Sequence, residues 1–236
     1  MTGVLAIDTA TDACSIALWR DGQVEELHEI TPRQHNQRLF TMLRELLPDG
    51  LLAGNGIDAI AYGSGPGSFT GLRIAASAVQ GLAFAADIPA VAVSTLACQA
   101  QTALRQGLAQ EGDRVFSALD ARINEIYYAC FKIVNGQPES VGEAKACAPA
   151  DVRLDSIEQT LVAVGSGCQF VEQFPEIVRE QIPALYPQLL PHAQDLVPLA
   201  LASLRTGRSQ AAAEVQPVYV RDEINWKKIP EQGKQT

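Results

Sequence analysis

Positive charge is scarce in this chain, which has 18 Lys and Arg residues against 27 Asp and Glu residues. Its formal net charge at pH 7 is −9. Affinity for the phosphate backbone of nucleic acids comes from Lys and Arg side chains, so this balance argues against tight nucleic-acid binding by the chain alone. A partner protein could still supply the basic surface.

Histidine and cysteine are also sparse, and their spacing excludes the common metal and redox motifs. The three histidines, His28, His35 and His192, lack the i, i+4 spacing that lets two imidazoles on one helix share a metal ion. We therefore expect isolated histidines and no metal site. The five cysteines are scattered without a CxxC pair, which favours reduced, mostly buried thiols.

The chain has no long hydrophobic run near its start. No basic residue precedes the first apolar stretch, and Asp8 interrupts that stretch. A signal peptide needs a basic region before its apolar core, and a membrane span needs about 20 apolar residues. We expect neither, and therefore a cytoplasmic protein without membrane contact.

Apolar residues make up 47% of the 236 positions, which is enough for a sizeable core in one large domain or two small ones. Short apolar runs predict strands, and apolar residues at helical spacing predict helices. The two kinds of segment alternate along the chain, as in α/β proteins. In the first half, strands are predicted over 4–7, 13–19, 24–30, 57–62 and 89–93, and helices over 35–47, 72–86 and 95–106.

A glycine-rich loop precedes the second of these helices, with the sequence Gly-Pro-Gly-Ser-Phe-Thr-Gly-Leu-Arg over 65–73. A glycine-rich turn that opens a helix is typical of phosphate binding. The Walker motif, however, requires a Lys followed by Ser or Thr after its last glycine, where this loop has Leu72 and Arg73. Two interpretations remain: an anion site of another kind, or a tight backbone path that lets the helix approach a neighbour closely. Ser68 and Thr70 have no nearby base, so we expect them to cap the helix.

The two halves of the chain begin alike. In each half an apolar run ends in an Asp, at Asp8 and at Asp120, that is followed by a turn and a returning strand. A second glycine turn, Gly-Ser-Gly at 165–167, follows a predicted strand at 161–164. This pattern indicates an internal duplication and resembles the actin, hexokinase and sugar-kinase type of ATPase fold. We predict an α/β protein of two related lobes, one covering 1–107 with 210–236 returning to it, the other covering 108–209.

Asp8, Thr9 and Asp120 are the candidate nucleotide-binding residues, because Asp-headed hairpins face the phosphates in folds of that type. The alternative is that both Asp side chains cap turns at strand ends through local hydrogen bonds. Ala10 and Arg122 stand where a phosphate-wrapping hairpin favours glycine, which weakens the nucleotide interpretation. The residues alone leave both interpretations open.

The predicted helices 35–47 and 72–86 carry the strongest pattern in the chain. Apolar residues of the first cover an arc of roughly 160°, which is wide for a helix that packs on one sheet. The second has small residues at three- and four-residue spacing, which permits close packing by a neighbour. Either the helices pack only on their own sheet and on each other, or they also present an apolar surface to a partner. The candidate partner-binding residues are Leu39, Phe40, Met42, Leu43, Leu46, Arg73, Ala75, Ala78 and Gly81.

Several segments together match a known family. Leu-Ala-Ile-Asp-Thr-Ala-Thr at 5–11 and Cys-Ser-Ile-Ala-Leu at 14–18 resemble the opening of the bacterial TsaB family. The loop with its following Ile, 65–74, resembles that family's most diagnostic segment. Asp-Ala-Arg and Glu-Ile-Tyr-Tyr-Ala within 120–129, and Pro-Val-Tyr-Val-Arg at 217–221, fit as well. The resemblance extends over essentially the whole chain.

The resemblance implies a non-catalytic dimerisation or scaffold subunit, required for N6-threonylcarbamoylation of the adenosine next to the anticodon in tRNA. In that family the subunit binds and activates the homologous catalytic subunit TsaD and works with the small ATPase TsaE. Helices that match 35–47 and 72–86 form the TsaD contact, and the same surface can support a homodimer. The complex, rather than this chain, would bind tRNA. TsaD-type enzymes carry a His-x-x-x-His metal motif that this sequence lacks, so no catalytic residue is expected here.

The resemblance also implies no cofactor of the chain's own, and it leaves open ATP or ADP at the junction between subunits. The alternatives are an independent ATPase that uses Asp8 and Asp120, and a peptidase, which the missing metal ligands disfavour. If the helices bind TsaD, Leu39→Glu or Ala78→Arg is expected to abolish the association and leave the fold intact. The reason is that an unpaired charge at an apolar contact is strongly unfavourable.

Overall fold

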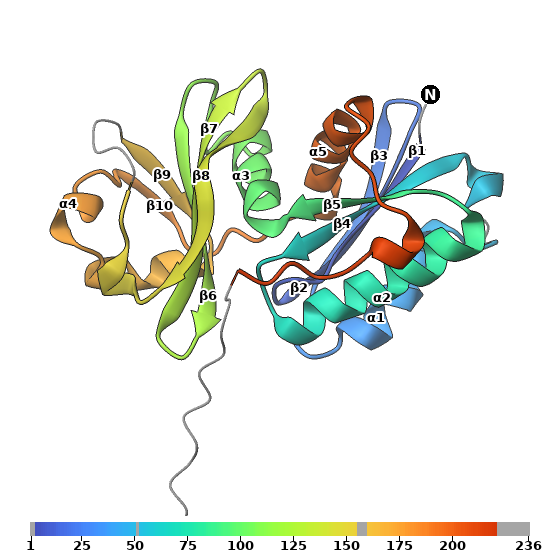
Figure 1. Cartoon of the computed structure of the whole chain (residues 1–236), viewed down its shortest axis with the longest axis horizontal. Helices are drawn as coiled ribbons and strands as arrows, with labels where there is room; N and C mark the ends of the chain where they lie inside the picture. Colours follow the sequence, from blue (N-terminus) through green and yellow to red (C-terminus); the bar gives the residue numbers. More distant parts are fainter. Residues whose placement is uncertain (1–2, 51, 155–159, 221–236) are drawn as a thin grey trace, which may run out of the picture.

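The computed structural model describes residues 3–50, 52–154 and 160–220, and these form two lobes that each contain a five-stranded sheet (Figure 1). The strands are β1 (Gly3–Asp8), β2 (Ala13–Arg20), β3 (Gln23–Ile30), β4 (Ile57–Gly65), β5 (Ala90–Ser94), β6 (Arg114–Arg122), β7 (Glu125–Val134), β8 (Gln137–Cys147), β9 (Leu161–Val164) and β10 (Ala184–Tyr186). The α-helices are α1 (His35–Leu46), α2 (Phe69–Ala86), α3 (Thr95–Arg105), α4 (Glu176–Arg179) and α5 (Ala193–Arg205). Short 3-10 helices are η1 (Ala53–Asn55), η2 (Pro149–Asp151), η3 (Ser166–Gln173) and η4 (Ala212–Glu214).

The two sheets have the same topology. In the first lobe, β1 pairs antiparallel with β2 and parallel with β4, in the strand order β3-β2-β1-β4-β5. In the second lobe, β6 pairs antiparallel with β7 and parallel with β9, in the order β10-β9-β6-β7-β8. Strands β6 to β10 therefore repeat β1 to β5 one for one. This repeat confirms the predicted duplication and the two-lobed α/β fold of the actin-like ATPase type.

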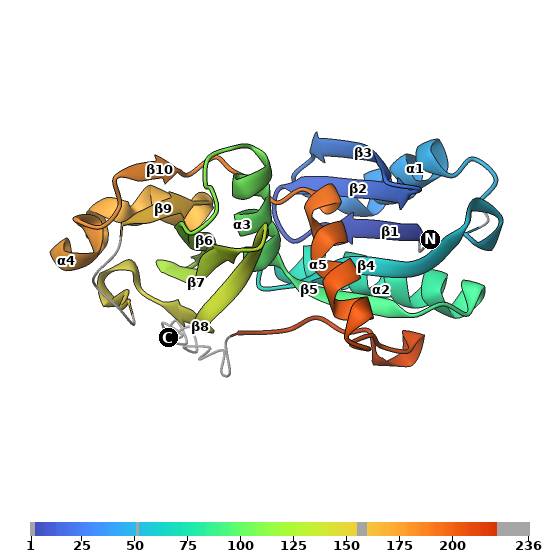
Figure 2. The ribbon, with the colours of Figure 1, turned by 90° about the horizontal axis from the view of Figure 1, so that it is seen from above.

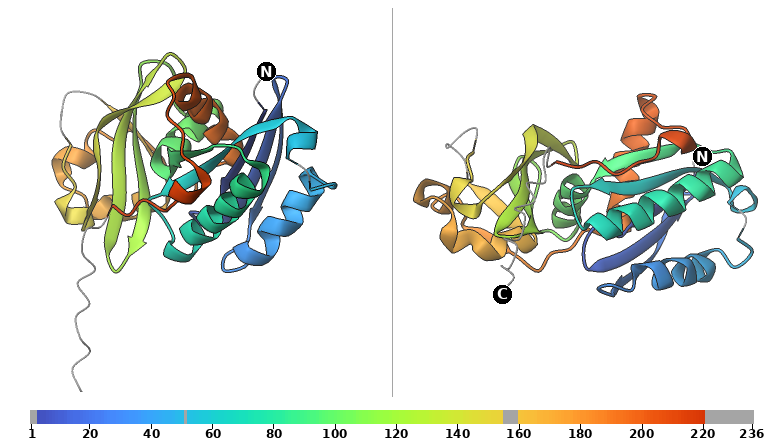
Figure 3. Two further views of the ribbon diagram at one scale, coloured as in Figure 1. Left: turned by 45° about the vertical axis from the view of Figure 1, so that its right-hand side comes forward. Right: turned by 60° about the horizontal axis from the view of Figure 1, so that its bottom comes forward.

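The first sheet separates two cores. Side chains alternate along a strand, so Leu5 and Ile7 of β1 face one core whereas Val4 and Ala6 face the other. Helices α1 and α2 lie side by side on the Leu5 face, and α5 covers the Val4 face (Figure 3). All four side chains are fully buried, as expected for a central strand with helices on both sides.

The last helix of each repeat packs on the other lobe. Helix α3 follows β5 but packs on β6, β7 and β8, with Leu96 and Ala100 in the core of the second lobe. Helix α5 follows β10 but packs on the first sheet through Leu196 and Ala200 (Figure 2). The predicted lobes 1–107 and 108–209 are therefore each wrong at the end, because α3 contributes to the core of the second lobe and α5 to that of the first.

Helices α3 and α5 contact each other between the lobes through a buried carboxylate. Asp195 accepts hydrogen bonds from Nε and Nη2 of Arg105, at 2.7 and 2.9 Å, and from Oγ1 of Thr102 at 2.7 Å. The Asp195 side chain is 3% exposed, so these interactions lie in a low-dielectric environment. Since a desolvated carboxylate depends on its partners, the three residues hold α3 against α5.

Among the described residues, α2 is the one helix long and apolar enough to cross a membrane. It begins at Phe69, earlier than the predicted start, because the hydroxyl of Ser68 caps the helix by accepting from the N–H of Gly71 at 3.3 Å. Ala75 and Val79 are fully buried against the first sheet. The apolar side of α2 thus has a partner within this fold.

After α5, which already lies on the first lobe, the chain continues along that lobe as an extended strap over 208–220 (Figure 1). Gln210 and Ala90 exchange backbone hydrogen bonds of 2.8 and 2.9 Å at the edge strand β5. Further along, the N–H of Val218 donates to a carbonyl of β4 at 2.8 Å. The rest of the predicted returning segment, 221–236, lies outside the described residues.

Candidate functional site

The glycine loop between β4 and α2 lies directly on the turn that follows β1. The N–H of Ser68 donates to the carbonyl of Ala10 at 2.7 Å. A Cβ atom on Gly67 would lie 2.4 Å from that carbonyl oxygen, and one on Gly71 would lie 1.9 Å from the carbonyl oxygen of Thr9. The loop needs glycine because two backbone segments approach more closely than a side chain allows. This geometry favours the close-packing interpretation of the loop over an anion site.

Asp8 and Thr9 are buried beneath this loop. The hydroxyl of Thr9 donates to the carbonyl of Gly71 at 2.7 Å, and Oδ1 of Asp8 accepts from the N–H of Ala10 at 2.9 Å. Oδ2 of Asp8 has no hydrogen-bond partner in the described part of the chain, and a Cβ on Gly63 would lie 2.0 Å from it. Asp8 is 1% exposed and Thr9 is 0% exposed. Neither residue can contact a nucleotide in this conformation, which corrects the nucleotide prediction for both.

The buried carboxyl of Asp8 predicts an unusual pH dependence of stability. Burial raises its pKa from 3.8 to about 7, although the hydrogen bond from Ala10 acts in the opposite direction. A carboxyl whose pKa is higher in the folded than in the unfolded state contributes stability that is lost as pH rises between the two values. When pH rises from 4.5 to 7.5, the native chain should therefore lose stability that Asp8→Asn does not lose. The unfolding free energy of Asp8→Asn minus that of the native chain should increase by about 3 kcal/mol over this range.

Urea unfolding of both proteins at the two pH values measures this change. Taking the difference between variant and native protein cancels the titration of every other group. A difference in unfolding free energy that is the same at pH 4.5 and pH 7.5 would show that Asp8 is ionised in the folded chain.

The second lobe repeats the arrangement at the end of β6. A Cβ on Gly167 would lie 2.9 Å from the backbone nitrogen of Leu119, and the hydroxyl of Ser166 accepts from the N–H of Asp120 at 3.0 Å. The Asp120 carboxylate accepts from the N–H of Arg122 at 2.8 Å and pairs with its guanidinium at 3.3 Å. Asp120 thus caps its own turn, which is the alternative to a nucleotide contact that the sequence left open.

The predicted partner-binding residues differ in burial. Those buried in the first lobe are Leu39, Met42, Ala75 and Ala78. Those partly buried are Leu43 and Leu46, and those exposed are Phe40, Arg73 and Gly81. The buried four belong to the core that holds α1 and α2 on the sheet, and of these only Ala78 also reaches the surface between the two helices. Leu39→Glu and Ala78→Arg would therefore disrupt the core, which corrects the expectation that they leave the fold intact.

A groove of about 510 Å³ lies between the outer sides of α1 and α2. Its lining consists of Asn36, Phe40, Phe69, Thr70, Arg73, Ile74, Ser77 and Ala78. Phe40 is 50% exposed and Phe69 is 52% exposed, although large apolar side chains are usually buried. Sequence reasoning missed Phe69 as a surface residue by assigning it to the loop. Its position four residues before Arg73, on one helical face, is the signal that could have found it.

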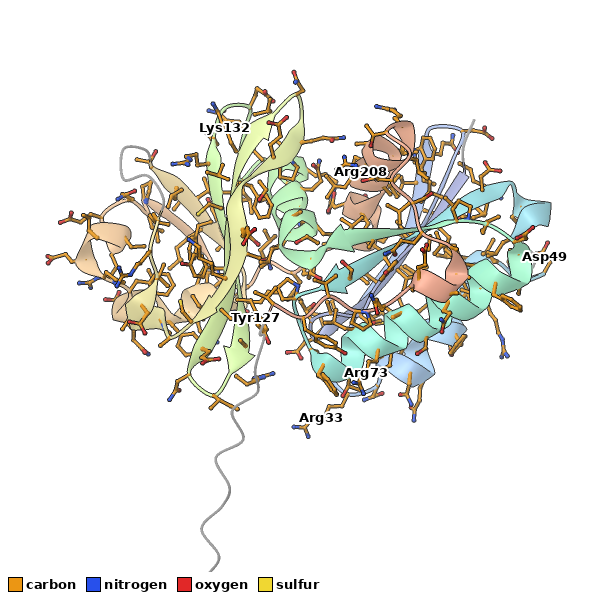
Figure 4. The ribbon with its side chains drawn as sticks, in the orientation of Figure 1. Arg33, Asp49, Arg73, Tyr127, Lys132 and Arg208 are labelled. Atoms are coloured by element: carbon orange, nitrogen blue, oxygen red, sulfur yellow. The ribbon has the colours of Figure 1, made fainter. Side chains whose placement is uncertain are left out.

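At one end of the groove, three side chains from α2 and the strap contact one another. The guanidinium of Arg73 lies 3.9 Å from the ring centroid of Phe69, and its Nε donates to Oη of Tyr219 at 3.2 Å. The rings of Phe69 and Tyr219 are 5.8 Å apart. Figure 4 shows Arg73 on the outward side of α2. Because the strap supplies Tyr219, the exposed surface combines α1, α2 and the strap.

Comparison with known proteins covers nearly all of the chain. A family model described as TsaD, tRNA N6-adenosine threonylcarbamoyltransferase, matches residues 27–228. The chain is 39% identical over 232 residues to the tRNA threonylcarbamoyladenosine biosynthesis protein TsaB of Escherichia coli K12, with 96% of this chain and 98% of the relative covered. The chain belongs to the TsaB family.

Further TsaB-family proteins agree in sequence and in structure. The TsaB of Haemophilus influenzae is 34% identical over 239 residues, covering 96% of this chain and 97% of that protein. A solved structure described as YeaZ from Pseudomonas aeruginosa superposes with a TM-score of 0.85 at 41% identity, covering 93% of this chain and 100% of that one. Both lobes are therefore present in that solved structure.

The glycine-rich loop has a structural explanation in this chain. Segment 65–74 brings the start of α2 onto the backbone of Thr9 and Ala10. This contact fixes where α2 begins, and hence where Phe69 and Arg73 lie on the surface. The glycines of this loop thus position the helix that lines the groove.

Proposed function

We propose that this TsaB-family chain is a non-catalytic subunit in the biosynthesis of N6-threonylcarbamoyladenosine in tRNA, and that the surface of α1, α2 and the strap binds a TsaD-type catalytic subunit. The observation that carries the proposal is the exposed aromatic groove. Phe40 and Phe69 line the groove and are 50 and 52% exposed, and Phe84, which is 80% exposed, lies further along α2 outside the groove. Exposed apolar clusters of this kind mark protein-binding sites, and aromatic side chains with Arg are enriched at them.

The charge and the buried residues support a role without chemistry of its own. A chain of net charge −9 leaves tRNA contact to basic partners, so tRNA would be bound through the complex. Asp8 and Thr9, which would face phosphates in an ATPase of this fold, are covered by the glycine loop. The TsaE-type ATPase would supply nucleotide hydrolysis, and ATP or ADP at the junction of the subunits belongs to the proposal. The cytoplasmic location stays a prediction.

A reconstitution with a TsaD homologue tests the proposal. The mixture should form a complex whose mass equals the sum of the two chains, and the modification of tRNA should require both. Calorimetric titration of the isolated chain with Mg-ATP should show no binding and no turnover. ATP hydrolysis by the isolated chain would instead identify an independent ATPase. Modification of tRNA by TsaD and TsaE without this chain would show that this chain is not a required subunit.

The groove should contain the residues that contribute most to this binding. Phe69→Ala is expected to raise the Kd for the TsaD homologue at least about 30-fold, because truncating a central interface aromatic costs about 2 kcal/mol or more. Calorimetry on the purified proteins measures the change. The thermal unfolding midpoint of Phe69→Ala should stay close to that of the native chain, since the ring is half exposed.

The same surface should also form a homodimer when TsaD is absent. A single apolar surface cannot be covered by two partners at once, so the homodimer and the TsaD complex should exclude each other. Adding the TsaD homologue to the dimer should convert it into a mixed complex with one copy of each chain. A mixed complex that retains two copies in contact with each other would place the homodimer contact on another surface.

A further inference from the structure

Arg73 is the one charged side chain among the described residues that line the groove between α1 and α2. The rest of the lining is apolar or neutral, with Phe40 and Phe69 as its largest side chains. A partner that fills the groove would therefore remove Arg73 from water along with these rings. Transfer of an unpaired charge out of water is strongly unfavourable, so the groove accepts a partner only if the guanidinium gains a counter-charge.

The guanidinium of Arg73 is held in place but is not neutralised. The ring of Phe69 lies 3.9 Å from it, and its Nε donates to Oη of Tyr219 at 3.2 Å. Within 3–50, 52–154 and 160–220, Nη1 and Nη2 have no carboxylate or other acceptor, and water hydrates them because the side chain is exposed. These two nitrogens form the end of the guanidinium fork, which fits both oxygens of a carboxylate.

Helices α1 and α2 have no acidic residue that faces the groove. No Asp or Glu occurs within Phe69–Ala86, and His35–Leu46 contains only Glu45. Glu45 follows Phe40 by five positions, which places it about 140° further around the helix. Its carboxylate lies 4.0 Å from Nη2 of Arg38. Neither helix therefore supplies the counter-charge that the groove needs.

Elsewhere this chain pairs the charges that it buries. The Asp195 carboxylate, at the junction of the lobes, has Nε of Arg105 at 2.7 Å. The Glu26 side chain of β3 is 11% exposed, and its Oε2 lies 2.9 Å from Nδ1 of His192. The His192 ring in turn stacks on that of His28 with 3.8 Å between centroids, so the expectation of isolated histidines is wrong for this pair. A groove that closed over an unpaired guanidinium would depart from this rule.

We propose that Arg73 determines partner specificity, and that the TsaD-type subunit presents an Asp or Glu side chain to its Nη1 and Nη2 groups. This inference rests on the proposed function, because it concerns the same groove. Guanidinium and carboxylate form two parallel, charge-assisted hydrogen bonds, which are stronger than neutral ones. Phe69 and Tyr219 hold the guanidinium before the partner arrives, so little side-chain freedom is lost when the pair forms.

The same arrangement disfavours association with a second copy of this chain. In a two-fold homodimer, each protomer contributes the same surface. Both protomers would then bring Arg73 into the contact, and no acidic residue of α1 or α2 faces the groove to meet it. Like charges without a counter-charge weaken such a contact. Arg73 therefore favours the mixed complex with TsaD over the homodimer.

Arg73→Gln should change the two associations in opposite directions. Its Kd for the TsaD homologue should rise at least about 30-fold, because the carboxylate of the partner is left buried and unpaired. Its homodimer Kd should fall about 10-fold, because two uncompensated charges leave the contact. Calorimetry measures the first Kd, and analytical ultracentrifugation measures the second. A folding defect would weaken both associations, so the opposite signs separate specificity from loss of structure.

The identity of the anion is tested in a buffer without phosphate, nucleotide or RNA. Under these conditions only a carboxylate can pair with Arg73. Arg73→Lys keeps the charge but lacks the planar fork, so its Kd for the TsaD homologue should lie between those of the native chain and Arg73→Gln. A rise in Kd for Arg73→Gln that appears only after ATP or tRNA is added would assign the guanidinium to a phosphate and overturn the proposal.

The control for an internal counter-charge uses Asp222 and Glu223, which follow the strap and lie outside the described residues. Asp222→Asn combined with Glu223→Gln should leave the Kd for the TsaD homologue unchanged. A rise equal to that of Arg73→Gln would place the counter-charge in this chain and overturn the proposal. So would an unchanged Kd for Arg73→Gln beside a raised Kd for Phe40→Ala, a result that keeps the groove as the binding surface. Absence of binding by the native chain would instead overturn the proposed function.

Discussion

Gly71→Ala is expected to destabilise the chain by about 4–6 kcal/mol, a large part of the 5–15 kcal/mol typical of a folded domain. The new Cβ would lie 1.9 Å from the carbonyl oxygen of Thr9 and 3.0 Å from its carbonyl carbon. Both are backbone atoms, so no side-chain rotation relieves the clash. The start of α2 would have to move away from the β1 turn. That movement would break the hydrogen bond from the Thr9 hydroxyl to the carbonyl of residue 71.

Gly81→Ala is the matched control for this prediction. It places the same methyl group on the same helix, where nothing in the described structure lies within 4 Å of the new atom. Alanine favours a helix interior over glycine, so this variant should gain up to about 1 kcal/mol. Urea unfolding of the two variants should give changes of opposite sign. Equal, small effects would mean that the glycine loop does not pack tightly on the β1 turn.

The second large effect is expected from Asp195→Ala, with a loss of about 3 kcal/mol. The substitution leaves the Arg105 guanidinium without its carboxylate at the junction of the lobes, while the Thr102 hydroxyl keeps only its bond to the carbonyl of Cys98. The Arg105 side chain is 35% exposed, so water can reach part of the guanidinium, and the loss reflects mainly the three hydrogen bonds to the buried carboxylate. Thermal and urea unfolding measure the loss, and hydrogen exchange should show reduced protection in α3 and α5.

Glu172→Ala is the control for the ion pair. It removes a partner of Arg179 at 3.3 Å, but the Glu172 side chain is 87% exposed, so water screens the interaction and little change is expected. If Asp195→Ala cost no more than Glu172→Ala, the buried pair would not be what holds α3 against α5.

Local signals in the sequence predicted the framework well. Asp-Gly at 21–22 and Asn-Gly at 135–136 are sequences typical of tight hairpin turns, and the structure has positive φ angles at all four residues. The apolar runs predicted β1, β2 and β4 because strands buried on both faces have few polar residues. Duplication could be predicted because both repeats use the same short-range pattern.

Long-range packing could not be predicted in the same way. The helical periodicity of α1 showed which residues are apolar, but not that Leu39 and Met42 are buried and Phe40 is exposed. That distinction depends on where the sheet lies relative to the helix. The stacking of His28 on His192 depends on the exchange of helices between the lobes, which no local pattern encodes.

The binding of a TsaD homologue to the groove is the central claim, and one affinity comparison tests it most directly. Phe40→Ala and Ile177→Ala each truncate a residue that is 50% exposed. Phe40 lines the groove, whereas Ile177 lies on α4 of the other lobe. Calorimetry should show a Kd raised at least about 10-fold for Phe40→Ala, or about 1.4 kcal/mol, and an unchanged Kd for Ile177→Ala. Equal Kd values for the two variants would contradict the assignment of the groove as the partner-binding surface.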